Sequence, residues 1–440
     1  MACLEDVGRD VTPAARVAII GGGYAGMAAA QTLTERGVHV SVFETGKVLG
    51  GRARRVEVRG EILDNGQHIL SGAYSTLLDL MQRTGVPDSH LLRVPLKLSM
   101  PPTFRMQAPA WPAPMHMAKA LLTAKGLTWC DRFSAIRFMR ALRAIGYTLD
   151  ASETVAALLT RLGQTPATTR FLWQPLAVGA LNTPIQTASA QVFVNVLRDA
   201  LDGKREASDL LLPRVDLSAL YPEPAARLVE ARGGEVRTGC RVLDVELRES
   251  GIRIATDEHH LDFDAVVIAV GPHQLEQLGL PAEANAIARS FSYEAIETIY
   301  FKFDTAVRLP EPMLGQAEGH VQWFFDRRAL FDPSATDGLI AGVVSAADPA
   351  HDVGEDAVWH ELTAHCPGLP RPVWIKTITE KFATFACTPE LQAQRPGASM
   401  SNPRVVLAGD YLASPYPATL ETAVRSGVVA AKSICRALIP

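Results

Sequence analysis

The sequence feature that most constrains the fold of this chain is a glycine motif, Gly21-x-Gly23-x-x-Gly26, between an expected strand and an expected helix. The β-branched run at residues 16–20 reads as the strand, and the alanine-rich run at residues 24–36 reads as the helix. The first glycine allows a tight turn, the second lets a pyrophosphate approach the backbone, and the third lets the helix pack closely on the strand. In this context the motif predicts a Rossmann-like, dinucleotide-binding unit.

An acidic residue and a second glycine pair follow this unit. Glu44 comes at the end of the strand expected at residues 38–43, where a carboxylate can bind the two hydroxyl groups of a ribose. Sites for NAD and for FAD share these features. The Gly-Gly-Arg motif at residues 50–52 offers backbone and a guanidinium group to the pyrophosphate of an extended FAD, so the sequence favours FAD.

Two later stretches continue the pattern of strands and helices. Residues 234–271 read as successive strands that end in a buried strand, and residues 404–410 read as a strand that precedes a helix at 419–438. The fold class expected is therefore α/β, with one Rossmann-like FAD-binding domain built from separated segments and with other units interleaved. The expected units are the FAD-binding domain at residues 12–98, 205–275 and 396–440, a helical insertion at 99–204, and an α+β substrate-binding domain at 276–395.

Composition excludes several classes of protein. The chain has 43 basic and 47 acidic residues, so its net charge of -4 gives no attraction for phosphate backbones, and no nucleic acid partner is expected. The six cysteines are scattered without a Cys-x-x-Cys pair or a Cys/His cluster, which predicts no metal site and fits a reducing cytoplasm. No apolar stretch is long enough to span a bilayer.

The segment 101–147 differs in charge from the rest of the chain. Seven basic residues face one acid there, and on a helical wheel for residues 131–145 most of the basic and most of the apolar side chains fall in opposite arcs. Two interpretations stay open. The basic arc is either a solvated face over a core stripe or a contact with an anionic membrane surface. The chain is thus expected in the cytoplasm, where it could lie on the inner face of the membrane.

With its Gly-Gly-Arg motif the chain resembles the FAD-dependent amine oxidase and phytoene desaturase superfamily, whose members place this motif at the same point. The resemblance implies that the backbone of Val242 meets the adenine, that Gly409-Asp410 holds the ribityl chain, and that the helix start at Thr419 points at the flavin pyrimidine ring. Taken alone, Asp410 could be a turn residue and Thr419 an N-cap. The residues expected to bind FAD, without a covalent link, are Gly21, Gly23, Gly26, Glu44, Gly51, Arg52, Val242, Gly409, Asp410 and Thr419.

Within that superfamily the chain resembles the hydroxysqualene dehydroxylases of bacterial squalene and hopanoid synthesis. The resemblance rests on LDNGQH at residues 63–68, on residues 174–184 and 216–218, and on the close PATLETAVRSGVVAA. It implies that the chain uses FAD to reduce hydroxysqualene to squalene with loss of water, and that its partners are a hydrophobic triterpene substrate and upstream enzymes of the squalene pathway. Two alternatives stay open: a desaturase of a carotenoid or other polyisoprenoid, and a non-enzymatic carrier of prenyl groups.

The implied chemistry requires an acid that helps water leave and an apolar tunnel. Asp64 and His68 are the candidate catalytic residues, because the resemblance places their loop beside the flavin, although a buried histidine is more often structural. Amine oxidases of the superfamily use a lysine near the flavin, but Lys302 is shifted from that register and is expected to be a solvated strand residue. The tunnel candidates are Phe171, Leu172, Trp173, Phe193, Trp323, Phe324, Phe325, Phe382 and Phe385.

Overall fold

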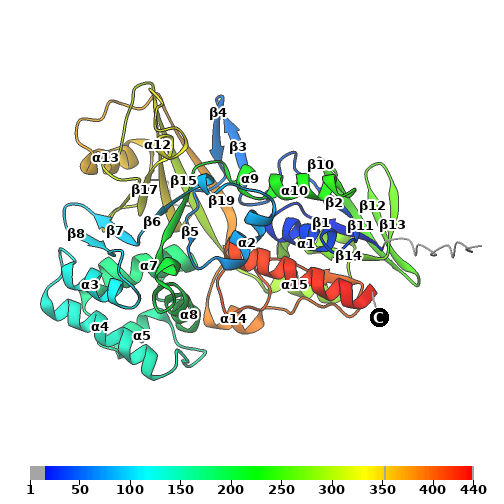
Figure 1. Cartoon of the computed structure of the whole chain (residues 1–440), viewed down its shortest axis with the longest axis horizontal. Helices are drawn as coiled ribbons and strands as arrows, with labels where there is room; N and C mark the ends of the chain where they lie inside the picture. Colours follow the sequence, from blue (N-terminus) through cyan, green and yellow to red (C-terminus); the bar gives the residue numbers. More distant parts are fainter. Residues whose placement is uncertain (1–14, 351–352, 439–440) are drawn as a thin grey trace, which may run out of the picture.

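A five-stranded parallel sheet lies at the centre of the first of three lobes in the computed structural model, which describes residues 15–350 and 353–438 (Figure 1). The sheet is assembled from chain segments that are far apart in sequence, and all of its neighbouring strands run parallel. In spatial order its strands are β10 (Glu235–Thr238), β2 (His39–Glu44), β1 (Arg16–Ile20), β14 (Ala265–Ile268) and β20 (Val405–Leu407). The expected α/β class, with a Rossmann-like sheet built from separated segments, is confirmed.

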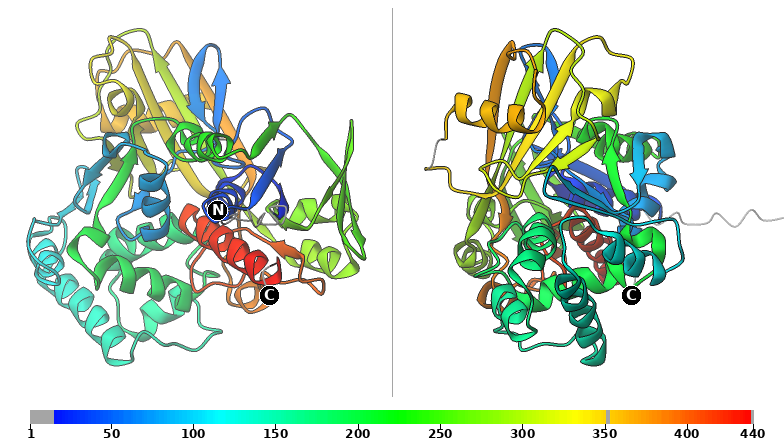
Figure 2. Two further views of the ribbon diagram at one scale, coloured as in Figure 1. Left: turned by 45° about the vertical axis from the view of Figure 1, so that its right-hand side comes forward. Right: turned by 90° about the vertical axis from the view of Figure 1, so that its left-hand side faces the viewer.

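Two helices from opposite ends of the chain pack against each other beside this sheet. Helix α1 (Tyr24–Thr34) follows β1, and α15 (Leu420–Leu438) follows β20 and runs through the middle of the molecule (Figure 2). Their approach is close because a β-carbon at Gly427 would stand 2.1 Å from the carbonyl oxygen of Ala25. The packing of α15 on α1 therefore depends on small residues at the contact.

The second lobe contains an antiparallel sheet in the order β16-β17-β18-β15-β19. Its strands are β16 (Met313–Gly315), β17 (Trp323–Asp326), β18 (Gly338–Ala347), β15 (Tyr293–Phe303) and β19 (Trp374–Phe385), accompanied by α12 (Arg327–Phe331) and α13 (Glu355–His365). Alternate residues of β15 point to opposite faces. Ile299, Phe301 and Phe303 are buried in one apolar cluster with Trp359 of α13, as the alternation of the sequence predicts.

Lys302 is not the solvated residue that we expected. Its side chain is only 13% exposed and forms ion pairs with Glu61 and Asp337. The hairpin of β3 (Arg55–Val58) and β4 (Glu61–Asp64) contributes Glu61, and it covers the side of β15 that the alternation rule had assigned to solvent. The alternation of residues along β15 cannot show whether another element, such as this hairpin, covers one face of the strand.

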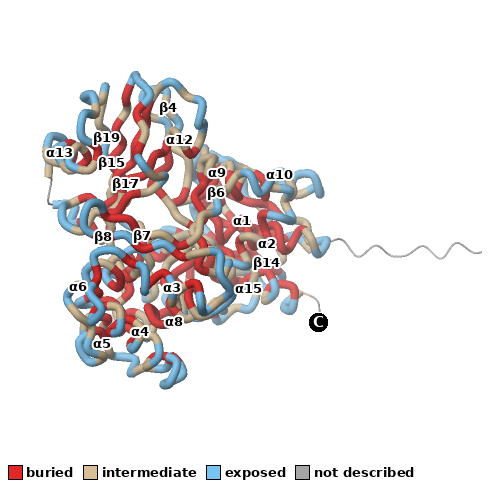
Figure 3. The backbone as a smooth tube through the Cα atoms, turned by 60° about the vertical axis from the view of Figure 1, so that its left-hand side comes forward, coloured by how far each residue is buried: buried red, intermediate tan, exposed pale blue. Residues whose placement is uncertain are grey.

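The third lobe is helical, and Figure 3 shows its buried inner and exposed outer positions. Its helices are α3 (Met115–Thr123), α4 (Trp129–Ala144), α5 (Val155–Arg161), α6 (Pro166–Thr168), α7 (Gln174–Leu181) and α8 (Ala190–Leu201). The boundary expected between residues 98 and 99 falls inside a hairpin, because β7 (Lys97–Met100) pairs with β8 (Phe104–Gln107).

Smaller elements connect the three lobes. They are β5 (Leu70–Ser71), β6 (Leu91–Val94) and β9 (Leu210–Pro213) in one sheet, β11 (Val242–Arg248), β12 (Gly251–Thr256) and β13 (His260–Phe263) in another, and helices α2 (Ser75–Arg83), α9 (Leu217–Leu220), α10 (Pro222–Ala231), α11 (Ala282–Ser290) and α14 (Pro389–Gln394). Within the described ranges, no helix is both long enough and apolar enough to cross a bilayer.

Candidate active site

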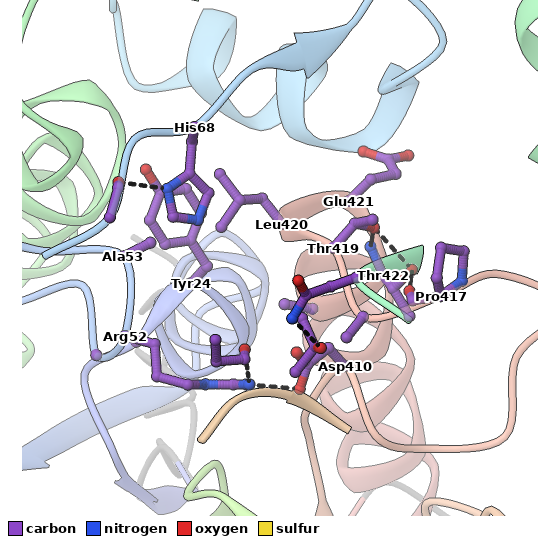
Figure 4. A pocket seen from close by; sticks show the side chains of 18 of the residues that line it. Tyr24, Arg52, Ala53, His68, Asp410, Pro417, Thr419, Leu420, Glu421 and Thr422 are labelled. Carbon is purple, nitrogen blue, oxygen red and sulfur yellow. Dashed lines mark hydrogen bonds and ion pairs between the residues drawn. The ribbon is translucent and has the colours of Figure 1, made fainter. Parts of the chain in front are cut away.

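A cavity of about 800 Å³ lies where the three lobes meet. It begins at the glycine turn after β1 and passes the start of α15 (Figure 4). From there it extends between the helical lobe and the antiparallel sheet. Most of the residues proposed from the sequence to bind FAD line it. Because separate elements converge on this one space, the cavity is the site whose chemistry must be explained.

The three glycines of the motif after β1 have different surroundings. A β-carbon at Gly26 would stand 1.9 Å from the carbonyl oxygen of Gly21, and one at Gly21 would stand 2.7 Å from that of Ala269. Backbone packing therefore requires both of these glycines. A β-carbon at Gly23 would meet nothing nearer than 3.7 Å, an ordinary contact distance, so the fold does not require glycine at this point of the cavity wall at the start of α1. No side chain caps this helix start, whose N–H groups suit a pyrophosphate.

The second glycine pair packs against the first turn. The N–H of Gly50 donates to the carbonyl of Gly22 (3.0 Å), and Gly50 and Gly51 both adopt positive φ angles, which other residues rarely adopt. Beside them, the Glu44 carboxylate accepts hydrogen bonds from the N–H groups of Gly22 and Gly46, each at 2.7 Å. These bonds orient Glu44 at the cavity wall, where a ribose would meet it.

Arg52 joins the glycine turns to the C-terminal part of the site. Its guanidinium group lies 2.7 Å from the Asp410 carboxylate and donates to the carbonyl of Ala383 at 2.8 Å (Figure 4). Both Arg52 and Asp410 line the cavity. The expected contact of Arg52 with a pyrophosphate stays a prediction, while its ion pair with Asp410 is a partnership that the sequence did not indicate.

The remaining residues proposed to bind FAD lie along the same wall. Val242 begins β11 and lines the cavity next to the β10–β11 turn, which is bonded to the backbone of Glu44 through Cys240. Gly409 is held by a hydrogen bond from its N–H to the hydroxyl of Ser426 (2.8 Å). Thr419 accepts from the N–H of Thr422 at 3.1 Å, so it is an N-cap of α15 as well as a cavity residue.

The structure brings His68, but not Asp64, to the cavity. His68 lines the cavity wall, and its Nδ1 lies 2.7 Å from the carbonyl oxygen of Gly66 (Figure 4). In the neutral ring Nδ1 therefore donates to that carbonyl, and Nε2 has a free lone pair. Burial lowers the pKa of His68, and the positive charges of Arg52 and Arg327 lower it further. The ring is therefore neutral at pH 7 and becomes a proton donor only in acid.

Asp64 lies behind the cavity wall in a buried ion pair. Its carboxylate contacts the guanidinium group of Arg327 and accepts a hydrogen bond from the N–H of Leu217 at 2.8 Å. Burial raises the pKa of Asp64 to about 6, against the opposing effect of Arg327. Since both carboxylate oxygens have protein partners and neither lines the cavity, this geometry does not support Asp64 as the acid that the sequence suggested. It holds the base of the loop that carries His68.

Four of the nine tunnel candidates line the cavity and five do not. Phe193, Trp323, Phe325 and Phe382 are cavity residues, whereas Phe171, Leu172, Trp173, Phe324 and Phe385 pack into the core clusters. Strand alternation separates the neighbours Phe324 and Phe325, because successive side chains of β17 point to opposite faces.

The cavity has an apolar arm that the sequence analysis missed. This arm runs along α8 and the hairpin of β7 and β8, and its lining includes Leu98, Leu176, Val196, Leu197, Ala200 and Leu210. The apolar residues of α8 recur at helical spacing, which core residues also do. The sequence therefore offered no signal that distinguished a tunnel wall from ordinary core.

Further polar residues at the site also escaped the sequence analysis. Glu421 lines the cavity, but its two oxygens accept from the N–H groups of Thr76 and Leu77 at 2.9 and 2.8 Å, so it caps α2. Asn65 donates to Glu380 at 2.8 Å across the wall near Arg52. Of the described residues, no group of three or more His, Cys, Asp or Glu side chains could hold a metal ion.

This fold and this cavity define a flavoenzyme. The chain matches the model of the flavin containing amine oxidoreductases over residues 24–435 and belongs to that family. It is an FAD-dependent oxidoreductase, and the open turn at Gly23 and the uncapped start of α1 fit a dinucleotide. The alternative of a non-enzymatic carrier is thereby set aside.

The individual proteins that are similar to this chain include a dehydroxylase, a desaturase and an oxidase. A hydroxysqualene dehydroxylase from Sinorhizobium fredii is 28% identical over 434 residues, which cover 93% of this chain and 96% of that protein. A probable zeta-carotene desaturase from Synechococcus elongatus is 23% identical and covers 96% of this chain and 99% of its own. A solved structure of a putrescine oxidase shares the fold with a TM-score of 0.70 at 17% identity, covering 96% of this chain and 99% of its own.

Proposed function

We propose that this enzyme reduces hydroxysqualene to squalene with loss of water. The observation that carries the proposal is the apolar arm of the cavity, which continues from the FAD-binding turns and is lined by aliphatic and aromatic side chains. Its lining suits a long hydrocarbon whose one polar handle is a hydroxyl group. Similarity to a hydroxysqualene dehydroxylase along nearly the whole chain supports this substrate class.

The reaction needs a hydride at carbon and a proton at the departing oxygen. The glycine turns, Glu44 and Asp410 would hold FAD, which in its reduced form would supply the hydride. His68 is the residue that we assign to the hydroxyl, because its Nε2 is free to contact a substrate in the cavity. Hydroxide is a poor leaving group in an apolar cavity, so protonated His68 donates to the oxygen and water departs.

The loop that carries His68 is held in place by buried partners. Tyr300 donates to the carbonyl of Asp64 at 2.8 Å, and the hydroxyl of Thr298 lies 3.3 Å from the N–H of Gln67. The Asp64–Arg327 ion pair fixes the start of the same loop. We assign to these residues the positioning of His68 rather than contact with substrate.

A second candidate function is the desaturation of a carotenoid or another polyisoprenoid. The similarity to a zeta-carotene desaturase supports it, and neutral His68 would suit a base better than an acid. The amine substrates of oxidases in the superfamily are disfavoured, because Lys302 is tied to Glu61 and Asp337 outside the cavity lining.

The direction of the reaction is tested with reduced holoenzyme under anaerobic conditions. Incubation with hydroxysqualene, squalene and phytoene in separate reactions, followed by product analysis, should yield squalene from the first and no product from the others. Bleaching of oxidised enzyme by phytoene, with no reaction of hydroxysqualene, would support the desaturase.

The location of the enzyme follows from the proposed substrate. A hydrophobic triterpene resides in the lipid bilayer, so we also place the enzyme at the cytoplasmic surface of a membrane, near upstream enzymes of the squalene pathway.

A further inference from the structure

Exposed apolar side chains are concentrated on two helices of the helical lobe. Of the described large hydrophobic residues that are exposed, five lie on or just before α3 and α4, with 40% to 61% of each side chain accessible. We call these residues the α3–α4 face: Trp111, Met115, Leu122, Trp129 and Phe133. Isolated exposed apolar residues need no explanation, but a concentration of large aromatic and aliphatic groups on one element pair does.

Three of these side chains, Leu122, Trp129 and Phe133, lie around the connection between the two helices, whereas Trp111 and Met115 lie at or just before the start of α3. Leu122 is in the last turn of α3, Trp129 begins α4, and α3 packs against α4. Trp129 and Phe133 are one helical turn apart, with ring centroids separated by 6.2 Å. Membrane-interface proteins carry tryptophan and phenylalanine in this way, because the rings enter the boundary between headgroups and acyl chains.

Two cations of this segment lie against aromatic rings of the α3–α4 face. Arg132 lies 4.7 Å from the ring centre of Trp129, and Lys119 lies 5.8 Å from that of Trp111. Of the seven basic residues in segment 101–147, two form ion pairs with carboxylates. Arg105 pairs with Glu311, and Arg143 pairs with Asp202. Over the part of the chain that the structure describes, no ion pair engages the other five, which are Lys119, Lys125, Arg132, Arg137 and Arg140.

The inner side of α3 lies directly behind the apolar arm of the cavity. His116 of α3 is buried, and its Nε2 lies 3.2 Å from the hydroxyl of Ser208, which lines the cavity. Met115 and Lys119, on other positions of the same helix, are exposed. One helix therefore separates the place where a hydrocarbon would sit from the exposed apolar face.

We propose that the α3–α4 face docks on an anionic lipid bilayer and that the hydrocarbon substrate passes from that bilayer into the arm of the cavity behind α3. The inference rests on the proposed function in taking the substrate to be a bilayer hydrocarbon. The apolar side chains enter the headgroup boundary, and the five unpaired cations contact acidic headgroups. The basic arc expected for residues 131–145 contributes Arg132, Arg137 and Arg140 to these cations, whereas Arg143 is engaged by Asp202.

The test uses holoenzyme and vesicles without substrate. Wild type should sediment with vesicles of phosphatidylcholine mixed with phosphatidylglycerol, and the double variant W129Q/F133Q should bind about tenfold more weakly or worse, since two large apolar side chains are lost. The variant K119Q/K125Q/R132Q should lose the preference for phosphatidylglycerol over phosphatidylcholine alone. The matched control V373Q/V429Q changes two exposed valines elsewhere and should bind like wild type.

Turnover separates docking from chemistry. W129Q/F133Q should keep full flavin content and wild-type turnover of detergent-dispersed hydroxysqualene, while its turnover of vesicle-embedded substrate falls in parallel with binding. The proposal would be overturned if wild-type holoenzyme bound neither the vesicles with phosphatidylglycerol nor those of phosphatidylcholine alone. It would also be overturned if the W129Q/F133Q variant bound vesicles like the control. If hydroxysqualene is the wrong substrate, turnover is lost in every variant alike and the vesicle results still stand.

Discussion

Arg52 and Asp410, which are 358 positions apart in the chain, form an ion pair of 2.7 Å at the wall of the cavity. Arg52 follows the second glycine turn and Asp410 follows β20, so the pair fastens the two ends of the FAD-binding domain to each other. The same guanidinium group also donates to a carbonyl at the end of β19. FAD retention is therefore expected to depend on a contact that also holds domains together.

We expect Asp410→Asn to weaken FAD binding while leaving the fold intact. Asparagine keeps the shape of the side chain, but it removes the charge that orients Arg52. The loss should be about tenfold to a hundredfold in affinity, because a charge-assisted hydrogen bond is worth roughly 1.5–3 kcal/mol. Titration of the deflavinated protein with FAD measures this loss of affinity.

We also expect FAD to be bound without a covalent link. The FAD released from wild type on denaturation should be free in solution, and colour retained by precipitated protein would contradict non-covalent binding.

The two glycines at either end of α1's first turn offer a matched comparison. Gly26→Ala should disrupt folding, because its β-carbon would lie 1.9 Å from a backbone oxygen that cannot move away. Gly23→Ala should fold normally, since its methyl group meets neighbours only at ordinary contact distances, and it should lose FAD affinity by roughly tenfold or more if the pyrophosphate lies against this residue. Circular dichroism and flavin content distinguish the two outcomes. Equal FAD content in Gly23→Ala and wild type would place the pyrophosphate elsewhere.

The ion pair between Asp64 and Arg327 should act as a structural unit. Asp64→Asn retains an acceptor for the N–H of Leu217 but leaves a fully buried guanidinium group without its counter-charge, so we expect it to lower the free energy of unfolding by about 3–5 kcal/mol. The double variant Asp64→Asn/Arg327→Met should recover most of that loss. Urea denaturation of both variants and of Arg327→Met alone gives the coupling energy. Additive effects would show that the two side chains act independently.

The pH dependence of turnover tests His68. Its pKa lies below the ordinary value of histidine, so the imidazolium form is populated only as the pH falls through that lowered pKa. If the imidazolium is the acid, turnover per folded holoenzyme should rise as the solution is made mildly acidic. His68→Gln should lose this rise and be slower by roughly 10²–10⁴-fold.

Asp64 also titrates on the acid side of neutrality, so it supplies the control for that experiment. Burial raises the pKa of Asp64 to about 6, yet Asp64→Asn should keep the acid-side rise in turnover because its carboxylate does not line the cavity. A rise that persists in His68→Gln and disappears in Asp64→Asn would reverse the two assignments.

Short-range patterns in the sequence predicted the parts of the site that depend on neighbouring residues. The strand at 16–20, the close backbone packing at Gly21 and Gly26, and the cap at Thr419 each follow from backbone geometry within a few residues. The partners of polar side chains could not be predicted in this way. Asp64 forms an ion pair with Arg327, which is 263 positions away in the sequence. Nothing near Asp64 in the sequence indicates that a buried cation will lie beside its carboxylate.

The sequence also could not show which apolar side chains line the cavity and which pack in the core. A tunnel wall and a solid core require the same residues at the same spacing, so Phe325 and Phe324 were equal candidates until the orientation of β17 was known. Lys302 was misassigned because its partners, Glu61 and Asp337, come from elements that the strand pattern of β15 does not mention.

The strand order of the parallel sheet has a consequence for how the protein is made. Val266 in β14 pairs with Val405 in β20, which the ribosome adds long after β14, and α15 then packs on α1. Until that moment the nascent chain carries an unpaired, wholly apolar strand edge together with the uncovered surface of α1. Contacts of such long range are slow to form, and an open edge of this kind invites aggregation. Yield in a cell should therefore depend on chaperones that hold the unfinished chain, more than on the stability of the finished fold.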